Sequence, residues 1–184
     1  EQMKKKINSR TKAVLVVHMF GHPAEMDPIL KIIKQHNLYL IEDAAEAHGA
    51  TYKNKRVGSF GDLACFSFYA NKLITTGEGG MVLSNNNKLT KKIRSLRNLS
   101  FRPDRRFYHT EIGYNYRLTN MQAAIGISQI ENIKTHIDIK RKNTFLYNKI
   151  IRDMDLPLRL PHENENSKSV FWMYGIVLKN KKIN

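Results

Sequence analysis

The sequence has little cysteine, few acidic residues and no long hydrophobic run. One cysteine among 184 residues excludes an internal disulfide, and with it the class of small disulfide-stabilised scaffolds. No stretch approaches the roughly 18 consecutive apolar residues that a membrane-spanning helix requires. The 10 glycines are too few for a collagen-like repeat. With 41% hydrophobic residues in patterned blocks and 26% charged residues, the composition is that of a globular protein with a core.

Acidic residues are scarce relative to basic ones, with 16 Asp+Glu against 31 Lys+Arg and a formal net charge of +15. Such a surplus is typical of proteins that bind nucleic acid. Seven basic residues lie between 91 and 106, with Asp104 as the one acid among them. The segment lacks helix-turn-helix spacing, a zinc-ligand set and an aromatic RNA-binding motif. Nucleic-acid binding therefore stays open as an alternative, beside a basic surface that is simply solvated.

The single cysteine and the N-terminal residues indicate in which cellular compartment the protein is expected. Cys65 lies in the apolar run 63–66, which predicts a buried, reduced thiol and agrees with a cytoplasmic protein. The lysines at 4–6 followed by the apolar run 13–17 imitate a signal peptide. The apolar run is too short and no cleavage site of small residues follows, so a β-strand is the better interpretation.

The first third of the chain predicts a strand–helix–strand unit. The mainly apolar run from Val14 to Met19 indicates a buried strand, and a second such run ends at Glu42-Asp43. Between them, Asp27-Pro28 has the pattern of an N-cap followed by the first helical position. This spacing predicts a βαβ unit and hence a parallel sheet.

Further elements follow from similar patterns. Thr119 with Gln122 predicts a capping box that opens one long helix, whose apolar stripe reaches Ile137. The chain then ends on a single fresh strand with no partner, in which Trp172 is expected to pack into the core; this ending suggests a truncation. The other predicted elements are strands at 64–69, 81–84 and 170–178 and a helix at 86–99.

Three side chains combine into one chemistry. Asp43 follows a buried strand, and Ser67 and Lys72 lie at the end of the next strand, five residues apart. Ligands of open α/β sheets bind at the carboxyl ends of parallel strands. There a lysine can form a Schiff base with an aldehyde cofactor, a serine can hold its phosphate, and an aspartate can keep a pyridine nitrogen protonated. Taken singly, each residue also has a structural interpretation, as a surface lysine, a small core serine or a helix N-cap.

Five segments carry a resemblance to a known family. They are 42–50, 58–62, 66–72, 76–80 and 113–120. In this order they resemble the DegT/DnrJ/EryC1/StrS family of pyridoxal-phosphate-dependent sugar aminotransferases. The basic and aromatic segment from Phe101 to His109 is similar to the branch of GDP-perosamine synthases.

The resemblance implies an α/β fold, the large domain of the fold type I, aspartate-aminotransferase-like enzymes that bind pyridoxal phosphate. Residues 1–150 would form part of that large domain, whose N-terminal portion is absent, and residues 151–184 would begin the small C-terminal domain. A chain lacking the glycine-threonine turn that grips the phosphate is expected to bind the cofactor weakly and to show no turnover by itself. An inactive remnant of such an enzyme is the second alternative.

The implied reaction moves an amino group from an amino acid, with glutamate expected, to a nucleotide-linked 4-keto-6-deoxy sugar such as GDP-4-keto-6-deoxymannose. In this resemblance Lys72 carries the cofactor and shuttles the proton, and its retention favours transamination over the dehydration performed by a related branch that has histidine there. Asp43 would pair with the pyridinium nitrogen, Ser67 would bind the phosphate, and Glu46 would lie close to the cofactor. We interpret His48 as a structural residue of the turn after the strand.

The remaining implied contacts involve a second subunit and the substrate. Asn115 and Arg117 match residues that reach the cofactor phosphate from the neighbouring subunit, which implies a homodimer with its active site at the interface. Arg102, Arg105 and Arg106 are assigned to the diphosphate of the nucleotide sugar. Part of the +15 charge is thereby attributed to anionic small molecules.

Overall fold

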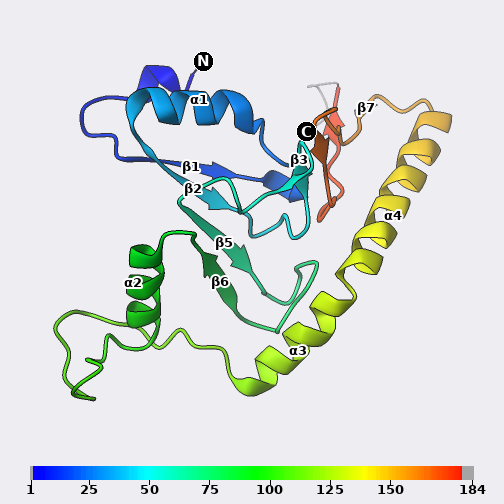
Figure 1. Ribbon diagram of the computed structural model, residues 1–184. Helices are drawn as coiled ribbons and strands as arrows, with labels where there is room; N and C mark the ends of the chain where they lie inside the picture. Colours follow the sequence, from blue (N-terminus) through cyan, green and yellow to red (C-terminus); the bar gives the residue numbers. More distant parts are fainter. Residues whose placement is uncertain (1, 180–184) are drawn as a thin grey trace.

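A computed structural model describes residues 2–179, in which helices surround an open central sheet (Figure 1). The strands of this sheet lie in the order β1–β2–β5–β6; β1, β2 and β5 are parallel and β6 is antiparallel to β5. Their bounds are β1 (Ala13–Val17), β2 (Tyr39–Asp43), β5 (Leu63–Ser67) and β6 (Gly80–Leu83). The predicted βαβ unit is confirmed, because α1 (Met26–His36) connects the parallel strands β1 and β2.

Helix α1 covers one face of this sheet. Its side chains Met26 and Ile33 pack with Val16, Leu40 and Tyr52 in one buried cluster. The predicted N-cap was wrong, since Glu25 precedes the helix and Asp27 lies within its first turn. A carboxylate is favourable at both places, because the helix N-terminus carries partial positive charge.

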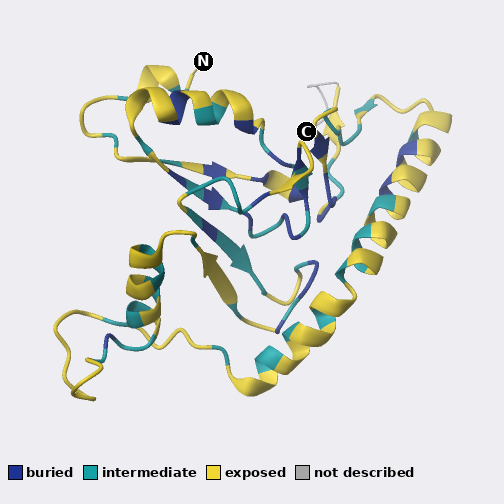
Figure 2. Ribbon diagram, viewed as in Figure 1, coloured by how far each residue is buried: buried dark blue, intermediate teal, exposed yellow. Residues whose placement is uncertain are grey.

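A second core lies beyond the carboxyl ends of the strands. Ala44, Ala47, Ala50, Val57 and Leu73 form it together with Val170, and Ile133 and Ile137 pack against it. A small antiparallel sheet borders it, in the order β4–β3–β8. Figure 2 shows that buried residues concentrate in these two regions, whereas α3 and most of α4 are exposed. The bounds are β3 (Thr51–Tyr52), β4 (Lys55–Arg56) and β8 (Ser167–Lys168).

The predicted capping box is confirmed, but the single long helix is wrong. The Gln122 amide donates to the Thr119 hydroxyl (3.2 Å), and the Thr119 amide donates to the Gln122 side chain (2.9 Å). The helix is interrupted at Asn132, whose side-chain amide donates to the Ser128 carbonyl (2.9 Å) and whose φ and ψ are −100° and 5°. A side chain that competes for a helical carbonyl can break the pattern in this way. The helices are α2 (Asn87–Arg97), α3 (Asn120–Glu131) and α4 (Ile133–Asp153).

The C-terminal part differs most from the prediction. Instead of one strand over 170–178, only β9 (Val177–Leu178) forms, and it pairs with β7 (Leu158–Arg159). Phe171 has a left-handed backbone (φ 48°), which interrupts an extended run there. Short 3-10 helices are η1 (Lys4–Lys6) and η2 (Met19–Gly21), the second of which ends the predicted strand 14–19 early. Cys65 is half-buried rather than buried. Within residues 2–179, no helix is long and apolar enough to cross a membrane.

Candidate active site

Asp43 and Ser67 lie on the same face of the central sheet, at its carboxyl edge. Asp43 is the last residue of β2 and is in register with Cys65 of β5. Residues in register point to the same face, so Ser67 lies on that face too, roughly 7 Å further along the strand direction. This face is the one opposite α1, since the alternate residues Val16 and Leu40 pack with that helix.

Asp43 is held in an acceptor role. The amide of Ala45 donates to its Oδ1 (3.1 Å). Burial, together with the negative charge of Asp43, raises the pKa of the Cys65 thiol. The thiol therefore stays protonated at neutral pH and is a poor nucleophile. Cys65 is therefore not the reactive group at this edge of the sheet.

Lys72 lies in the turn that follows β5. Its amide donates to the Tyr69 carbonyl (3.0 Å), and its Nζ lies 4.0 Å from the centroid of the Trp172 ring. Trp172 is buried, as expected, and its indole N–H donates to the Asn71 carbonyl (2.8 Å). A cation–π contact of this kind is worth about 1 kcal/mol. The turn thus presents the amine at the same strand end as Ser67.

His48 lies beside Lys72 and Ser67 as a neutral ring. Burial, and secondly the charge of Lys72, lower its pKa to about 4. Its ring packs 5.2 Å from that of Phe66 and 5.8 Å from that of Phe68 between centroids. A backbone group of Ser67 raises the pKa slightly, although neither ring nitrogen has a hydrogen-bond partner within residues 2–179. His48 therefore places an uncharged polar ring in the wall of the site.

The low pKa of His48 predicts an acid-dependent loss of stability. Between pH 6.5 and about pH 4 the unfolded chain protonates this histidine and the folded chain does not. Folding stability that is fully present above pH 6.5 is therefore lost as the pH falls, by about 3 kcal/mol in total. His48→Phe is expected to flatten the pH dependence of the free energy of unfolding in this window, measured by urea titration. The exposed His36→Gln serves as the control, and an unchanged slope in His48→Phe would contradict the assignment.

Glu46 bonds to the backbone of η2, the short 3-10 helix that follows β1. Its carboxylate accepts a hydrogen bond from the Phe20 amide (2.7 Å). Phe20 has a left-handed backbone conformation (φ 54°), which this bond helps to hold. The structure thus places Glu46 three residues from Asp43, at the edge of the site, with one carboxylate oxygen committed to a backbone contact.

Asn115 and Arg117 lie away from the Asp43–Lys72 site. The Arg117 Nε donates to the Asn115 side chain (3.0 Å), and both residues are exposed. Their segment is tied to α2, because the Tyr114 amide donates to the Leu96 carbonyl (2.7 Å). In Figure 1 this part of the chain runs beyond β6, between α2 and α3.

The three arginines assigned to the substrate lie in the same exposed loop. Arg102 forms a two-pronged ion pair with Asp104 (2.9 and 2.6 Å), which neutralises its charge locally. Arg105 lies 5.3 Å from the ring of Tyr108, and Arg106 lies 5.1 Å from that of Phe107. The structure does not bring these arginines to Asp43 or Lys72 of the same chain.

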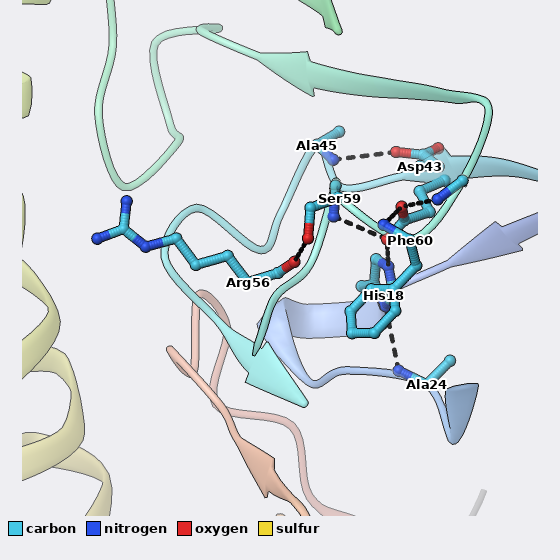
Figure 3. A network of polar contacts seen from close by, with 10 residues as sticks. His18, Ala24, Asp43, Ala45, Arg56, Ser59 and Phe60 are labelled. Carbon is cyan, nitrogen blue, oxygen red and sulfur yellow. Dashed lines mark hydrogen bonds and ion pairs between the residues drawn. The ribbon is translucent and has the colours of Figure 1, made fainter. Parts of the chain in front are cut away.

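Glu42 and His18 are two fully buried residues next to the site for which the sequence patterns indicated no role. Their contacts form part of the polar network of Figure 3, in which both His18 Nε2 and the Phe60 amide bond to the Glu42 carboxylate. Glu42 shares the face of Leu40, and this alternation was the one available signal that its carboxylate is buried.

Comparison with known proteins places the chain in a family. The sequence profile of the DegT/DnrJ/EryC1/StrS aminotransferase family matches residues 1–184. The chain therefore belongs to this family of aminotransferases.

Individual relatives make the similarity more specific. The chain is 45% identical over 172 residues to GDP-perosamine synthase of Caulobacter vibrioides, covering 94% of this chain and 46% of that protein. PseC of Helicobacter pylori, an aminotransferase involved in the biosynthesis of pseudoaminic acid, superposes with a TM-score of 0.91 at 32% identity, covering 98% and 48%. The GDP-4-keto-6-deoxy-D-mannose-3-dehydratase of E. coli, with bound hydrated PLP, has a TM-score of 0.86 at 28% identity, covering 99% and 50%. The chain thus spans about half the length of the relatives it matches.

Proposed function

We propose that this chain forms the catalytic centre of a pyridoxal-phosphate-dependent sugar aminotransferase. The observation that carries the proposal is that Asp43 and Ser67 lie on one face at the carboxyl edge of β2 and β5, with Lys72 in the turn that follows β5. A carboxylate, a hydroxyl and a primary amine are the donor set that pyridoxal phosphate requires. When bound, this cofactor supplies an aldehyde that condenses with an amine and a ring that accepts electron density from a deprotonated carbon.

Each residue of the site would have a separate role, which follows from the chemistry of its side chain. The Asp43 carboxylate would accept a hydrogen bond from a protonated ring nitrogen, and its charge would favour that protonation. The Ser67 hydroxyl, which accepts a hydrogen bond from the Tyr69 amide (3.3 Å), would donate a hydrogen bond to the phosphate. The Lys72 amine would carry a proton between the substrate carbon and the aldehyde carbon of the cofactor. Glu46 would line the rim of this site.

We assign an amino acid, glutamate, as the donor and GDP-4-keto-6-deoxymannose as the acceptor. The similarity to GDP-perosamine synthases supports this acceptor. The exposed Arg105 and Arg106 offer two cations for its diphosphate. An inactive remnant with the same site is the competing assignment.

The assembly we propose is a cytoplasmic homodimer. Asn115 and Arg117 are exposed, and the Arg117 Nε bonds to Asn115 rather than to Asp43, Ser67 or Lys72 of the same chain, which supports their serving the site of a neighbouring chain. Residues 1–150 would belong to the large cofactor-binding domain, and residues 151–184 would begin a smaller one.

Reductive trapping tests the cofactor assignment. The chain is mixed with pyridoxal phosphate, treated with borohydride, digested and analysed by mass spectrometry. The phosphopyridoxyl label is expected at Lys72, and a folded chain labelled at other lysines but not at Lys72 would contradict the proposal.

An assay of the full reaction distinguishes an active transferase from an inactive remnant. The chain, cofactor, glutamate and GDP-4-keto-6-deoxymannose are incubated, and GDP-linked amino sugar is sought by mass. Amino-sugar formation supports an active transferase. Labelling of Lys72 without amino sugar supports the remnant, or a site that needs further chain to complete it.

A further inference from the structure

We propose that Glu42 is a positioning residue that acts through Asp43. With His18, its buried carboxylate forms a clamp that fixes the end of β2, where Asp43 leaves the strand. This inference rests on the proposed function of Asp43, and it assigns a role to two residues that make no contact with a cofactor in the mechanism above.

The Glu42 carboxylate is fully buried and receives four hydrogen bonds. The amides of Phe60 and Gly61 donate to Oε1, each at 2.7 Å. The amide of Gly58 donates to Oε2 at 2.7 Å, and His18 Nε2 donates to the same oxygen at 3.2 Å. A carboxylate with four donors is satisfied on both oxygens, which explains how a charged group is tolerated in the interior.

His18 joins the clamp to the backbone of Asp43. Its Nδ1 accepts a hydrogen bond from the Ala24 amide (3.1 Å), so the ring proton is carried on Nε2, which faces Glu42. Its own amide donates to the Asp43 carbonyl (3.0 Å). One residue therefore contacts Glu42 through its side chain and Asp43 through its backbone.

The other arm of the clamp is the turn from Gly58 to Asp62. Gly58 has a left-handed φ of 83°, which glycine adopts without cost. At Gly61 a Cβ atom would lie 2.7 Å from the Leu40 carbonyl oxygen, so the turn approaches β2 as closely as the backbone allows. Asp62 adds a bond from the Leu40 amide (2.8 Å) to its carboxylate. Two carboxylates thus join the turn to β2 by hydrogen bonds, that of Asp62 and that of Glu42.

The contacts of Glu42 favour a role in positioning Asp43 over a role in the stability of the fold alone. The two arms of the clamp meet one peptide bond before Asp43, and the Glu42 carboxylate bonds to His18 and to the turn at 58–61 rather than to Lys72 or Ser67. Releasing the clamp should therefore move Asp43 more than it moves the other two groups. Misplacement of a catalytic group by about 1 Å can cost a large factor in rate or affinity.

A double-mutant cycle on the 184-residue chain tests this role. Glu42→Gln keeps the shape of the side chain but offers two of the four donors an NH₂ group. The cofactor concentration that half-saturates reductive trapping at Lys72 is expected to rise about tenfold, the cost of one weakened charge-assisted hydrogen bond. The maximal trapping rate should change by less than about twofold. In an Asp43→Asn background, Glu42→Gln should add no further rise.

Asp62→Asn is the matched control, because it alters a carboxylate of the same turn that also bonds to β2 but not to His18. It is expected to lower the thermal midpoint without raising the half-saturating concentration. An equal rise for Glu42→Gln with and without Asp43, or an equal rise for Asp62→Asn, overturns the inference while leaving the proposed function intact. A parent chain that is not labelled at Lys72 overturns the proposed function and this inference together.

Discussion

Replacing Lys72 with methionine is expected to abolish reductive capture of pyridoxal phosphate at residue 72 and to remove all turnover of any assembly that contains the chain. Methionine keeps the length and the apolar stem of the side chain but has no amine to condense. The Trp172 ring, 4.0 Å from Nζ, can pack against the new side chain, so the fold should be retained. Mass spectrometry of the trapped protein and the thermal midpoint measure the two parts of this expectation.

Lys140→Met is the control for this result. The Lys140 Nζ donates to the Trp172 carbonyl (3.3 Å), so this lysine lies in the same region and its replacement removes the same charge. It is expected to leave capture at Lys72 unchanged. Equal loss of capture in both variants would mean that the local charge, rather than the Lys72 amine, controls the reaction.

Replacing Glu42 with alanine is expected to lower the free energy of unfolding at pH 7 by about 3–5 kcal/mol, the range for removing one member of a buried charged network. Four hydrogen-bond donors lose their acceptor at once. Urea titration at pH 7 measures the loss. Glu111→Ala is the comparison, because it removes an exposed ion pair with Lys92 and should cost less than about 1 kcal/mol. Similar losses in the two variants would contradict the assigned importance of the clamp.

The loss of stability caused by Glu42→Ala is expected to depend on pH. Burial alone would raise the pKa of Glu42, but the hydrogen bonds from His18 and the backbone amides outweigh it and hold the pKa below the usual value. The stabilisation is therefore present above the unfolded value of 4.5 and is lost as the pH falls through the folded value. The cost of Glu42→Ala should shrink below about pH 4.5. Glu163, whose pKa Arg141 helps to lower, is present in both proteins and cancels in the difference.

Local patterns predicted the sheet and the positions of the catalytic candidates. Apolar runs locate β1, β2 and β5 because buried parallel strands need continuous hydrophobic residues. The strand ends then place Asp43 and Ser67 at one edge. These inferences use only neighbours in sequence and the general rule for parallel sheets.

Features that depend on distant partners were not predicted. The irregular segment at 170–172 is set by the Gly21 carbonyl, which accepts from the Val170 amide (3.1 Å) across nearly the whole chain. The buried Glu42 is tolerated only because donors arrive from residue 18 and from 58–61. A charged residue is seldom buried unless it is paired, so the charge of Glu42 argued against the burial that strand alternation indicated.

The contact between Lys72 and Trp172 also equips the protein for optical study. Trp172 is the sole tryptophan of the chain, so intrinsic fluorescence excited in the indole band arises from one place. That place is within van der Waals reach of the amine assigned to the chemistry. Events at this amine can therefore be followed in real time by emission intensity, without a dye and without steady-state turnover.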